Sequence, residues 1–302
     1  MKGFIRDALL VIAFGVLILV PLEWKIGQRQ WIYQYKNWYL THRADDIKVL
    51  LLGHSLFASS LNPHALGDSV FNAASPSRHL CYDRLLAERH LPNLCNLKTV
   101  LFPLHTEMPY APSDITNLQF AYARYMHLYP DGKRWQWSAF LTGELNLENM
   151  KDYPAQKEIP PSQPFSEWVT DSMGYLPRYQ VWDPEKVKPF VPRDEVSREN
   201  REGYKAEMLR LARVCDDEGV RLILVMPPHS DTCINLSDPE RKMIGRVHEV
   251  VHEVQQVYPQ VEMLDYYEDS VFRSPSLYDE GYHLNHTGAT LLARRIKADT
   301  HL

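Results

Sequence analysis

The chain lacks the short motifs and the charge pattern of several large protein classes. Among its 302 residues it has only four cysteines, none in a C-x-x-C spacing, and no internal repeat is visible. Its formal net charge is -5 and it has no basic stripe interleaved with aromatic residues, so we expect no nucleic-acid partner. Apolar residues, by contrast, are abundant. Hydrophobic residues make up 45% of the sequence, and a chain of this length can bury an ample core.

The cysteines leave two alternatives open. Cys81 could pair with Cys95, and Cys215 with Cys233, in an oxidising compartment, although sequence does not establish disulfide geometry. The other alternative is free, buried thiols. We favour it for Cys215, which lies on an apolar helical stripe.

A long uncharged run opens the chain. Residues 8–22 carry no charge and follow Lys2 and Arg6, as in a signal peptide or a membrane anchor. The run alone spans about 22 Å, against roughly 30 Å for a bilayer core, and neighbouring apolar residues such as Trp24 extend it. No small-x-small cleavage pattern follows. We therefore predict that residues 1–27 are an uncleaved, single-pass anchor in the cytoplasmic membrane, with the remaining chain extracytoplasmic. A cleaved signal and a buried core helix are the alternatives, and the flanking charges do not decide the orientation.

Residues 28–46 are unusually aromatic. Their Trp and Tyr residues are Trp31, Tyr33, Tyr35, Trp38 and Tyr39. Such a segment suits an aromatic stalk that rests against lipid headgroups. An ordinary amphipathic helix packed on the domain explains the composition equally well.

From residue 47 short apolar strands alternate with helical stretches. The predicted strands are 47–52, 69–72, 99–104, 220–226 and 261–264. The predicted helices are 78–90, 197–218, 238–257 and 286–298. Continuous apolar strands separated by helices predict an α/β domain over 47–302, with a doubly wound, mostly parallel sheet and helices on both faces.

One stretch breaks this rhythm. Residues 107–194 hold many prolines and aromatic residues, too apolar for a linker and too interrupted for long helices, although 116–128 could be helical. We interpret the stretch as an insertion over the carboxyl edge of the sheet, either a lid that contacts substrate or a purely structural cap.

Ligands of doubly wound sheets gather beyond the carboxyl ends of the strands. The polar residues expected at that edge are His54, Ser55, Asn72, Ser75, His105, Thr106, Glu107, His229, Asp279, Glu280, His283 and Asn285. A serine becomes a nucleophile when an imidazole takes its proton and a carboxylate orients the imidazole. This edge offers all three groups.

Each central residue also has a structural explanation. Ser55 could cap a helix, His283 could be a hydrogen-bonded structural histidine, and Asn285 is expected to cap the last helix. Several histidines at one edge could also hold a metal ion, but His54, His105, His229, His283 and His286 show no H-x-x-x-H or H-E-x-x-H spacing among them. We therefore expect neither a metal nor another cofactor.

Three sequence blocks carry a resemblance to a known family. Val49 to Ser55 (VLLLGHS), Val70 to Ser75 (VFNAAS) and His283 to Ala289 (HLNHTGA) resemble the SGNH, or GDSL-type, hydrolase and acyltransferase superfamily, closest to its membrane-anchored cell-envelope members. The similarity covers about residues 47–105 and 195–299.

The resemblance implies roles for particular residues. Ser55 matches the nucleophile and His283 the base, while Glu280 stands three residues before the histidine, where the family usually has Asp. Asp279, one position earlier, is the alternative acid. The family's oxyanion hole uses the nucleophile's amide, a second-block glycine and a third-block asparagine.

This chain departs from the family at the oxyanion positions. It has Ala74 and Ser75 near the second position and His105 and Thr106 at the third, so backbone N–H groups are the expected donors at the second. Asn72 and His229 complete the candidate substrate contacts. His54 replaces a customary acid.

Two function classes follow. The first is an anchored serine esterase or O-acyltransferase that acts on an acylated glycan or other polymer of the cell envelope, with a membrane-embedded acyl donor protein as a further partner. The second is a catalytically degenerate SGNH-like module that binds such a polymer or a membrane acyltransferase.

Overall fold

In the computed structural model, a five-stranded sheet in the order β2-β1-β3-β4-β5 forms the centre of the domain, and every neighbouring pair is parallel. The structure describes residues 2–27, 32–112, 116–130, 132–139, 141–143, 162, 170–185, 198–230, 238–280 and 282–302. The predicted α/β class with a doubly wound sheet is confirmed.

The strands are short and almost entirely apolar. They are β1 (Val49–Leu51), β2 (Val70–Asn72), β3 (Thr99–Pro103), β4 (Arg221–Met226) and β5 (Glu262–Asp265). All residues of the first three strands are buried, and so are five of the six in β4. Strands covered on both faces have no polar side to alternate with, which explains their unbroken apolar runs.

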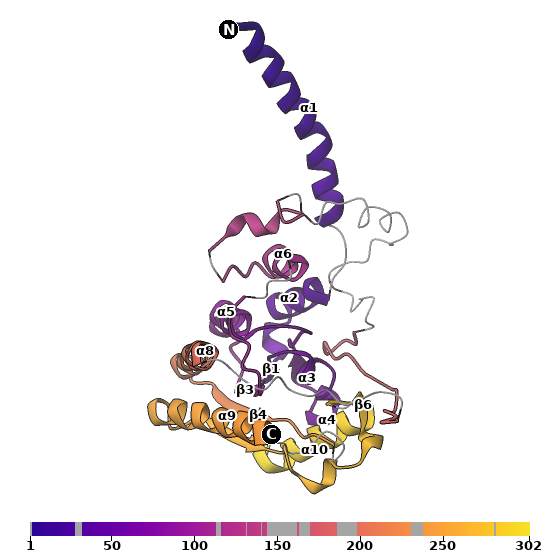
Figure 1. Ribbon diagram of the computed structural model, residues 1–302, viewed down its shortest axis with the longest axis vertical. Coiled ribbons are helices and arrows are strands. Elements are labelled where there is room, and N and C mark those ends of the chain that lie inside the picture. The colour runs from indigo at the N-terminus through magenta and orange to yellow at the C-terminus, as the bar shows by residue number, and fades with distance from the viewer. Residues whose placement is uncertain are drawn as a thin grey trace.

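Helices cover both faces of this sheet (Figure 1). On one face α5 (Leu80–His90) packs against α8 (Arg198–Asp217), which packs against α9 (Asp238–Val257). On the other, α10 (His286–Thr300) packs against α4 (Pro63–Leu66), near the one-turn helix α3 (Ser55–Ala58). The short 3-10 helices are η1 (Ala44–Asp46), η2 (Leu91–Asn93), η5 (Ser270–Phe272) and η6 (Pro275–Leu277).

The amino-terminal helices have different surroundings. Helix α1 (Lys2–Gly27) projects away from the domain (Figure 1), and none of its apolar span from Gly3 to Trp24 is buried. This excludes the buried-core alternative. Helix α2 (Ile32–His42) instead packs against α6 (Thr116–Tyr125) and buries Tyr33 and Tyr35. Of the two alternatives for residues 28–46, the described part shows the packed helix; Trp31 lies outside the described residues.

Part of the 107–194 insertion packs against the domain and is hydrogen-bonded to it. Residues 170–185 follow the carboxyl edge of the sheet, where Asn72 donates its amide N–H to the Met173 carbonyl (2.8 Å) and Leu176 donates to Ala58 (2.9 Å). Gly174 makes the first approach possible, because it has a φ of +79° and a Cβ there would collide with the Asn72 carbonyl. Another part of the insertion forms α6 and η3 (Arg134–Trp137), beside the end of α1.

A small second sheet lies outside the elements predicted from the sequence. Strands β6 (Tyr278–Glu280) and β7 (His283–Leu284) pair antiparallel just before α10. The cysteine alternatives are also decided in part: Cys81, Cys95 and Cys215 are free, with Cys81 and Cys215 buried. The proposed Cys81–Cys95 and Cys215–Cys233 pairs are therefore wrong, and Cys233 itself lies outside the described residues.

Candidate active site

The turn after β1 is held in place from behind. Gly53 has a φ of +106° and its N–H donates to Asp83 Oδ1 at 2.8 Å. Asp83 also forms an ion pair with Arg78 at 3.1 Å, and both side chains are buried. The next residue, His54, caps α3 by accepting from the Leu56 amide, so Ser55 is the first helical residue rather than the cap.

His283 and Glu280 form a hydrogen-bonded pair. The distance from His283 Nδ1 to Glu280 Oε1 is 2.9 Å. A carboxylate at Nδ1 fixes the ring proton on that nitrogen, which leaves Nε2 as a free base. His283 Nε2 is buried and has no hydrogen-bond partner among the residues that the structure describes. The expected contact between Glu280 and His283 is therefore present, while the catalytic roles of both residues stay predictions.

Arg178 joins the two candidate acids. One terminal nitrogen of its guanidinium lies 2.7 Å from Asp279 Oδ2 and 2.7 Å from Glu280 Oε1. Glu280 Oε1 thus accepts from His283 and from Arg178 at once. The hydrogen bond from His283, followed by the one from Arg178, lowers the pKa of Glu280 to about 2. Asp279 contacts Arg178 and has no hydrogen bond to His283.

Four histidines near this edge are neutral at pH 7. Burial lowers the pKa of His283, and the Arg178 charge adds to that effect while the bond to Glu280 opposes it. Burial also lowers the pKa values of His105 and His229 to about 4, and it depresses that of His54 further with help from His105. A histidine must be neutral to act as a general base, and a neutral imidazole can still donate one hydrogen bond.

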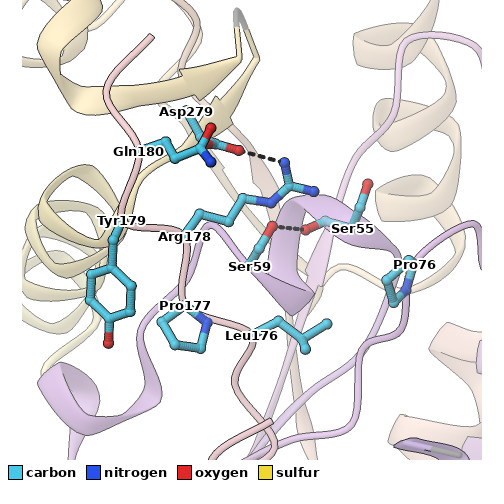
Figure 2. Close-up of a pocket in the computed structure, with 9 residues that line it drawn as sticks. All are labelled: Ser55, Ser59, Pro76, Leu176, Pro177, Arg178, Tyr179, Gln180 and Asp279. Carbon is cyan, nitrogen blue, oxygen red and sulfur yellow. Dashed lines mark hydrogen bonds and ion pairs between the residues drawn. The ribbon is translucent and has the colours of Figure 1, made fainter. Parts of the chain in front are cut away.

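A pocket of about 450 Å³ opens at Ser55. Its lining residues are Ser55, Ser59, Pro76, Leu176, Pro177, Arg178, Tyr179, Gln180 and Asp279. In Figure 2 the Arg178 side chain extends between Asp279 and the helix that carries Ser55. One wall of the pocket is therefore built by the insertion, as a lid over this edge predicts.

Ser55 and His283, the candidate nucleophile and base, come from adjacent elements but are not hydrogen-bonded to each other. Helix α3 packs against β7, and Leu284 donates its amide to Ser60 Oγ at 2.9 Å, which holds His283 beside the Ser55 helix. Within the described part of the chain His283 Nε2 has no partner, so no hydrogen bond joins it to Ser55, and His283 is not among the pocket's lining residues. Catalytic hydrogen bonds are often long without substrate and tighten in the complex.

The expected oxyanion donors of the second block are already in use. The amides of Ala73, Ala74 and Ser75 donate to Leu51 O, Asn72 Oδ1 and Gly53 O. These N–H groups are therefore hydrogen-bonded within the loop, and their use at the second oxyanion position stays a prediction. The amide of Ser55, by contrast, has no acceptor within the described parts of the chain.

Some of the other candidate residues are used in hydrogen bonds that hold the fold together, and others have polar groups that could contact a substrate. Asn72 is fully buried and also donates to the Phe57 carbonyl, and Ser75 accepts from Arg78, so both hold the loop together. His105 accepts the Glu107 amide on Nδ1 (3.0 Å), which leaves a proton on Nε2 to donate.

Thr106 is half-buried and makes no side-chain hydrogen bond within the described ranges. The His229 ring lies against Tyr267 in a tilted arrangement, with ring centroids 4.6 Å apart. Asn285 caps α10, as predicted.

One metal-type spacing is not among the sites predicted from the sequence. Residues 248–252 of α9 read H-E-x-x-H, a pattern that places two histidines on one helix face. His248 contacts Asp265 at 3.0 Å, while the His252 ring lies 3.2 Å from the Gln256 amide. Within the described residues, no three His, Cys, Asp or Glu side chains are arranged to hold a metal ion.

Arg178 is the site residue that sequence reasoning missed. It lies in the insertion, outside every block that resembles a family, and no motif marks it. Its place follows from tertiary contacts alone, since its carbonyl accepts from His286 and Trp182 donates to Tyr278.

Comparison with known proteins gives structural neighbours only. No family model and no curated protein matches the chain. Among solved structures, a GDSL-like lipase from Bacteroides thetaiotaomicron is 10% identical with a TM-score of 0.46, covering 90% of this chain and 100% of the other. An acetylxylan esterase from Geobacillus stearothermophilus, solved as a catalytic mutant, is 12% identical with a TM-score of 0.44, covering 84% and 93%. At these values the activity has to be argued from the site itself.

Proposed function

We propose that this protein is a membrane-anchored serine esterase or O-acyltransferase that acts on an acylated glycan of the cell envelope. The observation that carries the proposal is the buried His283, whose Nδ1 is held by Glu280 and whose Nε2 is unpartnered beside the helix of Ser55. A satisfied structural histidine would have both nitrogens bonded.

The proposed chemistry is acyl transfer through an acyl-enzyme. Ser55 Oγ attacks the acyl carbonyl while its proton moves to His283 Nε2, and Glu280 stabilises the resulting imidazolium. The sugar oxygen leaves with that proton. Water or a second sugar hydroxyl then attacks the acyl group with His283 as base, which gives hydrolysis or transfer. The amide of Ser55 and the Nε2–H of His105 are the candidate donors to the oxyanion.

The proposed anchor is α1. Its span from Gly3 to Trp24 has 22 residues, a mean hydropathy of 2.3 and no buried share. A helix of this length covers about 33 Å, enough for a bilayer core. Glu23, near its end, hydrogen-bonds to Ser138 and Ala139 of the domain, which favours an uncleaved helix over a removed signal.

A sugar as the substrate is supported by the pocket wall. Tyr179 is 74% exposed. Its ring lies against the ring of His286, with the two ring centroids 5.2 Å apart. Gln180 and Asp279 line the same pocket and add polar groups to it. An exposed aromatic face beside hydrogen-bonding groups suits a sugar ring, which has apolar faces and a polar rim.

Labelling with a fluorophosphonate probe tests whether Ser55 is activated. We expect the full-length protein in detergent to label, and Ser55→Ala and His283→Ala to lose labelling. Ser59→Ala is the matched control, because Ser59 lines the same pocket one helical turn away. It should label like the wild type. Labelling that survives in Ser55→Ala would contradict the proposed nucleophile.

The second candidate is a non-enzymatic module that binds an envelope polymer or a membrane acyltransferase. The observation that favours it is the engagement of all three second-block amides, which leaves fewer oxyanion donors than the family uses. No labelling of the folded wild type, together with retained binding to the acylated glycan, would establish this alternative.

A further inference from the structure

A set of exposed apolar and cationic side chains surrounds the end of α1 that faces the domain. We call it the foot surface. Its members are Trp24, Lys133, Arg134, Trp135, Trp137 and Leu141. The four apolar side chains are between 44% and 63% exposed, and they come from two segments more than 100 residues apart in sequence. Exposed tryptophans gathered in one place are uncommon on a surface that faces only water.

The two segments are fixed to each other by Glu23. Its carboxylate accepts the Ala139 amide at 2.9 Å and the Ser138 hydroxyl at 3.1 Å, with Arg124 at 3.6 Å. Ser138 Oγ in turn accepts the Leu141 amide at 3.3 Å. The segment that carries the foot surface is therefore attached to the last turns of α1.

The rest of that segment is held from the domain side. Gln136 and Ser138 are buried, and the Arg124 guanidinium lies over the Trp137 ring at 4.9 Å. Figure 1 shows the magenta η3 region beside the foot of α1, with α6 and α2 between it and the sheet. Packing thus presents Trp135, Trp137 and Leu141 outward.

The chemistry of the surface matches one occupant. Tryptophans next to lysine and arginine are typical of the zone where lipid tails meet headgroups. Glu23 and Trp24 mark the end of the apolar span, so residues attached to them lie at that same depth if α1 crosses a bilayer. The aromatic residues of α2 do not fill this role, since Tyr33 and Tyr35 are buried in the domain.

We propose that the foot surface is a second membrane-contacting element, which inserts Trp135, Trp137 and Leu141 into the headgroup region and seats the domain against the bilayer. This inference rests on the membrane anchoring proposed above. It gives the domain two attachments, one helix across the membrane and one patch upon it, which together fix its orientation.

The test is depth-dependent quenching of a fluorophore in the full-length chain. Cys95 and Cys233 are replaced by serine, and an environment-sensitive NBD label is placed at Leu141→Cys. Phe14→Cys, in the middle of α1, and Val257→Cys, at the end of α9, are separate labelled controls; both positions are exposed. Each protein is reconstituted in nanodiscs of zwitterionic and anionic phospholipid, with or without doxyl groups near the headgroups.

We expect the label at 141 to be blue-shifted and quenched by the shallow doxyl lipid severalfold more than the label at 257. Trp135→Ala with Trp137→Ala should reduce quenching at 141 while circular dichroism stays unchanged. If position 14 is buried in lipid and position 141 behaves like 257, the proposal fails while the anchor stands.

Two other outcomes overturn the proposal differently. If position 14 is also in water, the anchor and the foot surface fail together. If the label at 141 is shielded from aqueous iodide but not reached by doxyl lipid, a protein surface rather than lipid covers it.

Discussion

At the residue scale, the two candidate acids share one contact and differ in another. Both bind Arg178 at 2.7 Å, but only Glu280 also binds the ring of His283. Asp279 lines the pocket instead. This matched pair allows the orientation of the base to be tested separately from the charge near it.

We expect Glu280→Gln to reduce kcat on a small activated ester by roughly 100- to 10,000-fold, because the amide stabilises neither the tautomer nor the imidazolium. Asp279→Asn keeps the His283 contact and should lose no more than about tenfold. Steady-state kinetics with p-nitrophenyl acetate provides the measurement. A larger loss for Asp279→Asn would transfer the role of the acid to Asp279.

Arg178 should set the pH range of the reaction. The base works unprotonated, so the rate falls as the pH drops through the pKa of His283, which burial and then the Arg178 charge lower from its ordinary value. Removing the charge raises that pKa. We expect Arg178→Ala to move the acid limb of kcat/KM to higher pH.

Arg178→Lys, which keeps the charge, is the control and should leave the acid limb near its wild-type position. The Arg178→Ala variant should also lose roughly 10- to 100-fold in kcat, since Glu280 is no longer held in place. An unmoved acid limb with a normal kcat would show that Arg178 serves only to bind substrate.

At the element scale, long periodic segments were predictable and short ones were not. The predicted helices 197–218 and 238–257 correspond to α8 (Arg198–Asp217) and α9 (Asp238–Val257). Periodicity cannot be recognised in elements of two to four residues, such as the hairpin of β6 and β7 and the one-turn helices α3 and α4. They form because tertiary contacts hold them, such as the bond from Leu284 to Ser60.

The same reasoning explains which parts of the site the sequence predicted. The family resemblance implied the pairing of Glu280 with His283, and the two residues are close in sequence, so their contact depends little on the rest of the fold. The availability of second-block amides is a property of the folded loop, where Asn72 accepts from Ala74 and Lys36 of α2 donates to the Ala74 carbonyl. Lys36 is fully buried, a position that no sequence pattern assigns to a lysine.

The turn that carries Ser55 should depend on the buried pair of Arg78 and Asp83. We expect Asp83→Ala to lower the free energy of unfolding by about 3 to 5 kcal/mol, because it leaves the Arg78 charge uncompensated and the Gly53 amide without its acceptor. Urea denaturation measures this loss. Asp46→Ala removes an exposed ion pair with Arg43 and serves as the control, with little change expected. Similar small losses in both variants would mean that the buried pair does not support the turn.

At the scale of the whole molecule, the domain and α1 are distinct in how they meet solvent. The core runs from α2 through α10, and no part of the apolar span of α1 is buried in it. Among the described residues, Glu23 joins the two through its contacts with Ser138, Ala139 and Arg124. The sheet should therefore fold without α1, and Glu23 should stabilise the segment that bears the foot surface.

Two truncations separate these contributions. We expect a variant that begins at Leu22, and so keeps Glu23, to be soluble and to melt at the same temperature as the full-length chain in detergent. A variant that begins at Gln28 should also be soluble but should melt roughly 5 °C lower, because two hydrogen bonds to a charged acceptor are lost. Full-length Glu23→Ala is the matched control and should lose the same amount. Differential scanning calorimetry and size-exclusion chromatography report on both properties. Aggregation of the variant that begins at Leu22 would show instead that the apolar surface of α1 completes the core of the domain.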